Sequence, residues 1–489
     1  MNGAGLLFAS LLLGPATVAG IVLLRHHPNL REGLTLAAGT ALLAINLRIL
    51  SALNAGTPPS WQSADLLPGL GLELAVEPLG MLFALIASSL WLVTTVYAIG
   101  YLRGHGETHQ SRFYSFFALS ITCVMGIAFA GNLLTLFLFY ELLSLATWPL
   151  VVHAGTDRAR HGGRVYLGVL LGTSILFFLP AIILTWATAE SLTFTPGGVF
   201  GPSTPPALLA ALLVLFVFGV GKAAMMPFHR WLPAAMVAPT PVSALLHAVA
   251  VVKAGVFTLV KIGVYIFGLD QLSGVASREL LLYLAGFSLL AASIVAMRQD
   301  NLKARLAYST VSQLAYISLG ILLAVPSGIT GSGLHIAMHA FGKITLFFCA
   351  GAIMVAAHKT QVSELRGLGR QMPFTMGAFL LASLSIAGLP PTGGTWSKWY
   401  LLLGTLDAGA LLLAGALIVS TLLNLVYLTL IPVRAFWPGG AEPAPAGKLQ
   451  EAPLACCIAI GVTTAACLAL FLFPQPLYAL VSRIPGAGG

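Results

Sequence analysis

Long apolar runs, separated by short polar or Gly/Pro-rich turns, follow one another along the whole chain. Each run has about 20 residues or more, the length that a helix needs to cross roughly 30 Å of hydrocarbon. The pattern therefore predicts an all-α, multi-pass membrane protein with fourteen transmembrane helices. The predicted spans are residues 5–24, 33–53, 79–100, 113–130, 132–152, 165–187, 206–226, 241–267, 278–297, 303–324, 331–357, 374–401, 408–433 and 453–480.

The polar stretches between these runs are short. The longest are residues 55–68 and 438–453, and neither is long enough to bury a core of its own. We interpret residues 438–447, rich in Ala, Pro and Gly, as a flexible cytoplasmic link. The first apolar run has no basic region before it and is long enough to span, so we expect a retained helix and not a cleaved signal.

Composition supports the same fold class. The 489 residues are 58% hydrophobic and only 8% charged, and the mean hydropathy is +0.93. Soluble domains carry about a quarter charged residues, so a soluble globular protein is excluded. The five cysteines lie in apolar runs without CxxC or Cys/His spacing, and we predict no metal site and no cofactor.

The basic residues alternate between the two ends of the predicted helices. Sixteen of the 24 Lys and Arg residues lie in loops that follow odd-numbered spans. The positive-inside rule places these loops in the cytoplasm and both termini outside, for a protein of the bacterial cytoplasmic (inner) membrane. Because the basic residues are spread over many loops, the net charge of +9 does not indicate nucleic-acid binding.

A few ionisable residues interrupt the apolar runs. An ionisable group held in a membrane is costly and is therefore a candidate for function. They are one acid, Glu141, and five lysines, Lys222, Lys253, Lys261, Lys343 and Lys398. By helical rise, Lys261 is expected to reach the far interface, where it would snorkel in a structural role.

Residues 220–261 hold Lys222, His229, His247 and Lys253 among apolar residues and four prolines. Broken helices survive in a membrane beside a protein-lined cavity. We therefore expect the middle of a proton path in this stretch. For His229, at the cytoplasmic end of its span, a structural or gating role is an equal alternative.

Glu141 and Lys222 are the only oppositely charged residues expected at a similar depth. Burial disfavours a charged lysine and a nearby carboxylate favours it, so a proton that weakens the pair would let the lysine release its own. A static buried salt bridge is the alternative.

His335, His339 and Lys343 recur at intervals of four, which places them on one face of a helix. Histidines titrate near neutral pH and can pass a proton onward. We interpret the three as a relay, the alternative being hydrogen-bonded core histidines. His247, six residues before Lys253, could bridge two of the lysine sites.

Lys398 follows the break LPPTGG, as Lys222 lies beside a proline-bounded break in span seven. Two interrupted helices in two halves of a chain predict inverted repeats with a site at their interface. The alternative for Lys398 is snorkelling beside Trp396 and Trp399. No nucleotide-binding, hydrolytic or redox motif accompanies these residues, so the sequence predicts no such chemistry in this chain.

Five motifs resemble one family, the antiporter-like proton-translocating subunits of respiratory complex I, membrane-bound hydrogenases and Mrp-type cation/proton antiporters. The motifs are NLLTLFLFYELLSL, KAAMMPFHRWLPAAMVAPTPVSALLHAVAVVKAGV, DNLKARLAYSTVSQLAYISLG, HIAMHAFGKITLFFCAG and LPPTGGTWSKW, in the family's order over roughly residues 110–400. The resemblance implies that Glu141 and Lys222 form a coupled ion pair and that Lys253 connects it to the relay. It also implies that Lys398 is the exit residue.

The resemblance further implies fourteen helices with two inverted five-helix repeats, helices 4–8 and 9–13, in which helices 7 and 12 are broken. The expected units are 1–110 for helices 1–3, 111–270 and 271–436 for the repeats, and 437–489 for the link and helix 14. The implied partners are other membrane subunits, the lipid bilayer, protons and Na⁺.

Because the chain ends soon after helix 14, the resemblance favours the D-type component of an Mrp-type Na⁺/H⁺ antiporter. The alternative is a pump subunit of a complex I-like NADH:quinone oxidoreductase or a membrane-bound hydrogenase. An autonomous solute transporter is a third interpretation, disfavoured by the scarcity of buried acids.

Overall fold

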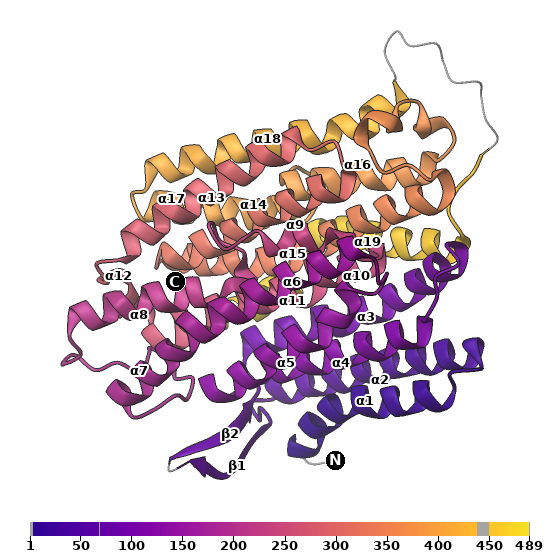
Figure 1. Cartoon of the computed structure of the whole chain (residues 1–489). Coiled ribbons are helices and arrows are strands. Elements are labelled where there is room, and N and C mark those ends of the chain that lie inside the picture. The colour runs from indigo at the N-terminus through magenta and orange to yellow at the C-terminus, as the bar shows by residue number, and fades with distance from the viewer. Residues whose placement is uncertain (1–2, 68, 438–448, 489) are drawn as a thin grey trace.

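The structure, a computed structural model, describes residues 3–67, 69–437 and 449–488. The predicted link at 438–447 lies outside these residues. The helices run side by side in one bundle, and a β-hairpin lies at one end of it (Figure 1). We call the end of the bundle that carries this hairpin, residues 60–75, the hairpin face.

The N-terminal part contains α1 (Gly3–Leu23), α2 (Pro28–Asn54), β1 (Ser60–Leu67), β2 (Leu70–Ala75) and α3 (Pro78–Gly104). The two strands pair antiparallel, with Ser60 opposite Ala75. The sequence predicted only a polar stretch at residues 55–68, so the hairpin is a feature that was not predicted. Glu77 caps α3 by accepting a hydrogen bond from the Gly80 N–H at 3.1 Å, which fixes where the helix begins.

The middle of the chain is interrupted more often. Its elements are α4 (Gln110–Ala128), α5 (Leu133–Val151), α6 (Asp157–Thr173), η1 (Ser174–Phe178), α7 (Leu179–Ala189), α8 (Pro206–Gly219), η2 (Gly221–Ala223), α9 (Trp231–Ala234), η3 (Ala235–Val237), α10 (Thr240–Ala244), η4 (Leu245–Val249), α11 (Val251–Ile262), η5 (Gly263–Phe267) and α12 (Leu269–Ser273). Here η1, η4 and η5 are π-helical turns, whereas η2 and η3 are 3₁₀ turns.

The C-terminal part is again built of long helices. It contains α13 (Arg278–Arg298), α14 (Leu302–Leu322), α15 (Pro326–Ala357), the 3₁₀ turns η6 (Val362–Leu365) and η7 (Leu368–Arg370), α16 (Pro373–Ala387), α17 (Gly394–Asp407), α18 (Leu411–Phe436), α19 (Leu454–Leu472) and α20 (Gln475–Val481).

Each of the fourteen predicted runs coincides with helix in the structure. Within the described residues, eleven helices are long and apolar enough to cross a membrane. The helical membrane fold is therefore confirmed, while the count of fourteen spans stays a prediction. The helices of predicted spans seven and twelve, α8 and α16, are shorter because both are broken.

The two predicted breaks lie where proline and glycine suggested them. α8 ends at Gly219 and gives way to η2, and α16 ends before Gly388, whose φ of +80° suits a residue without a side chain. Helix resumes only at α17. Whether the two halves are related as inverted repeats, with the four residue ranges as units, stays a prediction.

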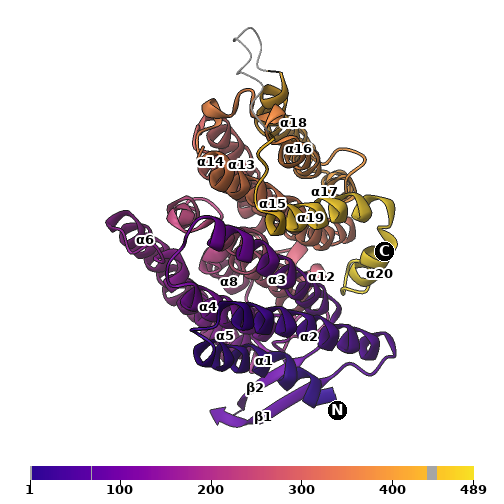
Figure 2. The same ribbon diagram turned by 90° about the vertical axis from the view of Figure 1, so that its right-hand side faces the viewer.

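The 32-residue helix α15 lies in the middle of the C-terminal half. It packs against α3, α14, α16, α17 and α19. In the end-on view, α19 lies between the N-terminal helices and the C-terminal ones (Figure 2). Most residues of α15 are buried, so most polar side chains along it lie among other protein groups.

Candidate functional site

The site is built around α15, because three of its ionisable side chains point into the protein. His335, His339 and Lys343 are at most 1% exposed. Their spacing of four residues stacks them along one side of the helix, and the rings of His335 and His339 lie 5.8 Å apart in a stacked arrangement. The predicted alignment along one helix is therefore present.

Lys253 joins this row from α11. Its Nζ lies 2.5 Å from Nδ1 of His339, and both side chains are buried. The π-helical turn η4 and the irregular backbone of Ala250 come directly before α11 and set the rotation with which Lys253 faces α15. Lys253 and His339 thus form the most direct contact between two of the predicted site residues.

The row continues from His335 towards α17. His335 contacts Ser397 Oγ through Nδ1 at 2.9 Å and Gln313 Oε1 through Nε2 at 3.1 Å, and its ring stacks on Tyr316 at 5.7 Å. Lys398 Nζ lies over the same Tyr316 ring, 4.5 Å from its centre. Side chains from α11, α14, α15 and α17 therefore form a continuous row from Lys253 to Lys398.

Lys398 passes through the second helix break. A Cβ on Gly388 would lie 2.5 Å from Lys398 Cδ, so the side chain crosses where the backbone carries no substituent. Its Nζ donates a hydrogen bond to Thr421 Oγ1 at 3.2 Å. A cavity of about 220 Å³ adjoins Lys398 and Thr421. Lys398 is 9% exposed and does not snorkel beside its tryptophan neighbours.

Lys343 leaves the histidine row and turns towards α14. Its Nζ donates to Ser309 Oγ at 2.8 Å and to the Leu306 carbonyl at 3.4 Å. No salt bridge to Lys343 is present in the described part of the chain. A buried lysine held by a hydroxyl and a carbonyl has hydrogen-bond partners but no counter-charge.

A buried polar cluster, which the sequence reasoning missed, connects Ser309 to Tyr316. The Tyr427 hydroxyl lies close to Ser309 and donates a hydrogen bond to Asn424 Oδ1. The Asn424 amide donates to the Ser420 carbonyl and hydroxyl at 2.6 and 3.3 Å. The Tyr316 hydroxyl hydrogen-bonds Thr421 Oγ1 and the Leu417 carbonyl, each at 3.2 Å, and lies close to the side chains of Ser420 and Asn424.

Two further hydroxyls complete this cluster. Ser293 and Ser312 lie 2.9 Å from each other, and 2.9 and 3.3 Å from Ser420, so α13, α14 and α18 meet at three serines. The signal in the sequence was a polar stripe in an apolar helix, since Ser420, Asn424 and Tyr427 recur at intervals of four and three.

Lys222 occupies the first helix break. Its Nζ donates to the Tyr140 carbonyl at 2.8 Å and to Ser144 Oγ at 2.7 Å, and it lies 3.2 Å from the centre of the Tyr140 ring. The side chain is fully buried. Both hydrogen bonds go to α5, so the break presents Lys222 to a single helix.

The expected ion pair between Lys222 and Glu141 is not formed. No salt bridge joins them, and within the described residues neither carboxylate oxygen of Glu141 has a hydrogen-bond partner. The reason is rotational. Tyr140 and Ser144 share a face of α5, and Glu141 lies about 100° round the helix from Tyr140. Glu141 therefore acts on Lys222 only through space.

The Lys222 segment nonetheless touches the helix that carries Lys253. A Cβ on Gly255 would lie 2.2 Å from the Ala223 nitrogen and 2.3 Å from the Lys222 carbonyl carbon. Only glycine permits this approach of η2 to α11. Gly255 thus holds the two regions together by backbone contact, two residues from Lys253.

The two auxiliary histidines do not bridge the lysines by direct contact. His247 lies in η4, fully buried, with its ring 4.7 Å from that of Phe347. Among the residues that the structure describes, neither of its ring nitrogens has a hydrogen-bond partner. The link to Lys253 comes from His339 instead. His229, in the turn before α9, lies 6.2 Å from the Tyr308 ring.

The expectation that Lys261 snorkels at the interface was wrong, and its structural role stays a prediction. The side chain is fully buried and does not snorkel. Its Nζ forms a salt bridge to Glu77 Oε1 at 3.0 Å and donates to the Ala130 carbonyl at 2.7 Å. The depth estimate had placed it correctly at the end of a helix, but other helices cover that end. On the hairpin nearby, burial raises the pKa of Glu73, and Thr193 and Lys261 oppose that shift.

At the face opposite the hairpin, a polar cavity of about 740 Å³ enters the bundle. Glu107 and Lys303 are among its lining residues, and so are Thr240 at the start of α10 and Ala350 of α15. Ala350 lies two helical turns from Lys343. The described residues contain no group of three His, Cys, Asp or Glu arranged to hold a metal ion.

Fold and site together define a multi-pass helical membrane protein of the antiporter-like type, with ionisable side chains in a row across the bundle. The chain belongs to the NADH:quinone oxidoreductase/Mrp antiporter transmembrane family, whose model matches residues 130–424. The family predicted from the motifs is confirmed.

Relatives come from several kinds of assembly. NADH-quinone oxidoreductase subunit N of Desulforudis audaxviator is 34% identical over 96% of this chain and 97% of its own length. Subunit L from Mycobacterium tuberculosis is 30% identical over 78% of this chain and 60% of that protein. A probable K⁺/H⁺ antiporter subunit of Rhizobium meliloti is 33% identical over 68% of this chain and 33% of that protein.

Two solved structures share the fold. One is the membrane-bound sulfane sulfur reductase, an archaeal respiratory membrane complex, with a TM-score of 0.86 and 21% identity over 98% of this chain. The other is the Mrp complex from Dietzia sp., with a TM-score of 0.84 and 22% identity over 99% of this chain. The protein is thus an antiporter-like subunit of the kind found in complex I-like and Mrp assemblies, and the predicted D-type Mrp component is not singled out.

Proposed function

We propose that this chain carries protons through the membrane along its buried row of lysines and histidines, as one subunit of a larger membrane complex. The observation that supports this most is the contact between Lys253 Nζ and His339 Nδ1 at 2.5 Å, continued by stacking to His335. Two titratable nitrogens at hydrogen-bond distance exchange one proton without an intervening group.

The proton enters through the polar cavity opposite the hairpin. That cavity is lined by Lys303 and Glu107 and reaches Ala350 on α15. The next ionisable groups inward are His247 and Lys343. Water in a polar cavity can carry a proton to this depth, because it hydrogen-bonds with groups that would otherwise be unpaired.

From the contact between Lys253 and His339 the proton has two routes to Lys398. The first passes through His335 and along Tyr316 and Ser397. The second passes from His339 to Lys343, one turn further along α15, and then through Ser309, Tyr427, Asn424 and Ser420 to the Tyr316 hydroxyl. Hydroxyl groups both donate and accept, so a chain of them can pass a proton on. Lys398 then releases the proton into its adjoining cavity.

Lys222 and Glu141 control proton movement along the row from Lys253 to Lys398. A lysine with neutral hydrogen-bond partners is sensitive to any nearby change of charge, because no counter-ion in contact holds its proton. The backbone contact at Gly255 passes a movement of Lys222 to the helix of Lys253. Direction and driving force come from partner subunits, with Na⁺ as a candidate coupled ion.

The test uses the purified complex in proteoliposomes with a fluorescent pH indicator. We expect Lys253→Met to stop proton movement while assembly and the partners' own activity persist. Proton movement at the wild-type rate in that variant would refute the proposed path.

Two assemblies are candidates for the host complex. The match to subunit N over nearly its full length favours an NADH:quinone oxidoreductase-like complex. The shared fold with an Mrp complex favours a cation/proton antiporter. Affinity purification in mild detergent separates the two, since the first brings flavin and iron–sulfur subunits and the second brings small membrane subunits only.

We further propose that the complex lies in the bacterial cytoplasmic membrane, with the hairpin face and both termini on the outer side. The basic loops at the opposite end support this orientation. Reporter fusions to each terminus test it, and a cytoplasmic terminus would reverse the direction assigned to entry and exit.

A further inference from the structure

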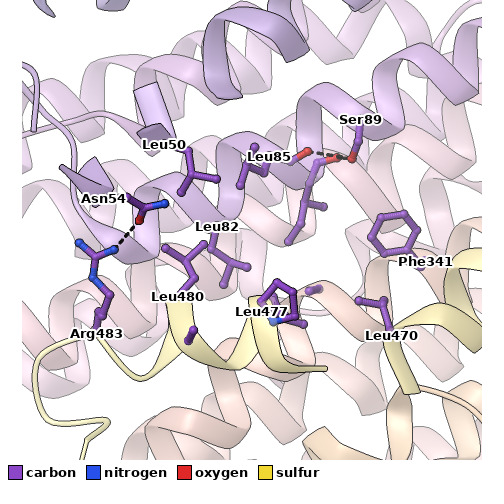
Figure 3. A pocket seen from close by; sticks show the side chains of 14 residues that line it. Leu50, Asn54, Leu82, Leu85, Ser89, Phe341, Leu470, Leu477, Leu480 and Arg483 are labelled. Atoms are coloured by element: carbon purple, nitrogen blue, oxygen red, sulfur yellow. Dashed lines mark hydrogen bonds between the residues drawn. The ribbon is translucent and has the colours of Figure 1, made fainter. Parts of the chain in front are cut away.

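A third cavity lies between α2, α3, α15, α19 and α20, against the side of α15 that faces away from His335, His339 and Lys343. Its volume is about 490 Å³, within the range of pockets that hold small ligands. Eleven of its fourteen lining residues are apolar, the exceptions being Asn54, Ser89 and Arg483. Figure 3 shows Arg483 and Asn54 at one end, and Phe341 and Leu470 at the other.

The cavity is as deep as one half of a membrane. Asn54 and Arg483 mark its mouth at the hairpin face, where α2 ends and α3 and α15 begin. Ser89 lies eleven residues into α3 and Phe341 fifteen residues into α15, hence about 16 and 22 Å inward at 1.5 Å per residue. A bilayer is roughly 40–45 Å thick with its headgroups, so a cavity that opens at headgroup level and is this deep ends near the middle.

Arg483 provides positive charge at the mouth. Its side chain is exposed, and it donates to Asn54 Oδ1 at 2.7 Å and to the Leu53 carbonyl at 3.1 Å. A guanidinium has five N–H donors, so three are left over. In the described residues no carboxylate lies within 4.0 Å of Arg483. The group is therefore held in place with its charge uncompensated.

The surroundings are those of a lipid-facing surface. Leu47 of α2 and Leu472 and Phe473 at the end of α19 are more than half exposed. A polar solute in the cavity would leave its polar groups without partners among eleven apolar side chains. An alkyl chain has no polar group that could be left unpaired in the cavity. A phosphate at the mouth would meet the remaining N–H donors of Arg483.

We propose that this cavity binds one anionic phospholipid of the leaflet at the hairpin face, with an acyl chain inside and its phosphate on Arg483. The depth of half a bilayer, the apolar lining and the single cation at headgroup level together match that molecule. The proposal does not depend on proton transport.

The test measures phospholipid retained by the purified complex. The complex is incubated with phosphatidylcholine vesicles containing phosphatidylglycerol, re-isolated in mild detergent and washed, and the bound lipid is counted by mass spectrometry. We expect about one tightly retained phosphatidylglycerol per chain in the wild type. Arg483→Gln, which can still donate to Asn54, should lower its retention about fivefold, because a charge-assisted bond to phosphate is lost.

Two variants that fill the cavity test the binding of the acyl chain separately from that of the phosphate. Ala479→Trp at the mouth and Ser89→Leu at depth place side-chain atoms in the cavity and should lower retention of either lipid about tenfold. Arg48→Gln on exposed α2 surface and Leu472→Trp outside the cavity are matched controls and should retain lipid as the wild type does. Size-exclusion profiles check that every variant is folded.

Two results would overturn the proposal. One is equal retention by Arg483→Gln, Ala479→Trp and their controls. The other is cross-linking of Ala479→Cys to a neighbouring membrane subunit in place of a photoactivatable phospholipid, since a protein segment would then occupy the cavity.

Discussion

Two of the regions that hold buried lysines, around α15 and around α5, are organised in opposite ways. Around α15, ionisable side chains touch one another directly, as Lys253 and His339 do, or through one aromatic ring, as His335 and Lys398 do. Around α5, Lys222 is held by a carbonyl and a hydroxyl, and the one acid nearby does not contact it. The first arrangement can pass a proton on, whereas the second can sense a charge.

The difference follows from the range of the two interactions. Proton transfer needs hydrogen-bond contact, either direct or through an intervening water, whereas a Coulomb interaction falls only with the inverse of distance and is strong where water is excluded. A sensor can therefore act across a dry gap. A relay needs water wherever its groups only stack, as between His339 and His335. Five sets of substitutions test this contrast, from the largest expected loss of proton transport to the smallest.

Lys253→Met should have the largest effect on proton transport. It removes a titratable group from the contact with His339, the only direct contact between Lys253 and a relay histidine within the described residues. Proton transport in proteoliposomes should fall about 100-fold, the scale typical of losing a proton-transfer group. Lys261→Met is the matched control, a buried lysine of the same helix outside the row. Equal losses in both variants would mean that any buried charge on α11 matters.

Gly255→Ala should uncouple the two regions. The added methyl group meets the backbone of Lys222 and Ala223, so η2 or α11 must shift. We expect a destabilisation of about 1–3 kcal/mol, as for overpacking, and about a tenfold loss of transport. Thermal unfolding in detergent and transport per folded complex separate the two effects. Gly415→Ala, at a site with open space beside the added methyl, is the control.

Lys222→Met and Glu141→Gln should differ, since the two side chains do not touch. We expect losses of about tenfold and threefold, and of about 30-fold in the double variant, because the coupling between groups that do not touch is small. The double-mutant cycle on transport rates measures this coupling. A double variant no worse than Lys222→Met alone would restore the ion pair as the working unit.

Tyr427→Phe and His335→Gln interrupt one route each. Because the second route persists, each should lower transport only about twofold, and the pair together should lower it far more than the product of the two. Tyr283→Phe, an exposed tyrosine on α13, controls for loss of a hydroxyl. A double variant whose loss is simply multiplicative would argue against parallel routes.

Lys261→Gln should leave transport per folded complex unchanged, because its partners are Glu77 and a carbonyl and not the relay. It should instead lower stability by about 1–3 kcal/mol, as expected when a buried hydrogen-bonded group loses its partner. The shift of the melting temperature and the transport rate are measured on one preparation. Lost transport with unchanged stability would place Lys261 in the path.

Much of this molecule was predictable from hydropathy and residue type alone. Each predicted run coincides with helix, and the breaks at Gly219 and Gly388 lie in the proline- and glycine-rich stretches. The candidate residues were found because ionisable groups in apolar runs are rare and stand out. The polar stripe Ser420, Asn424 and Tyr427 was missed because uncharged polar residues cost less in a membrane and are commoner there.

Partner choice could not be predicted in the same way. Glu141 and Lys222 share a depth, and the sequence suggested a pair, but one residue of offset on α5 turns the carboxylate away. Lys261 was assigned to the interface because rise along one helix says nothing about the helices that cover its end.

Hydropathy and residue type specify which residues enter the membrane, where helices break and which buried charges the chain must accommodate, because burial and helix breaking are local properties of side chain and backbone. Which charges meet is set by the packing of the helices. Each residue turns the helix by about 100°, so contact depends on how whole helices are rotated against one another, and packing at positions such as Gly255 sets that rotation.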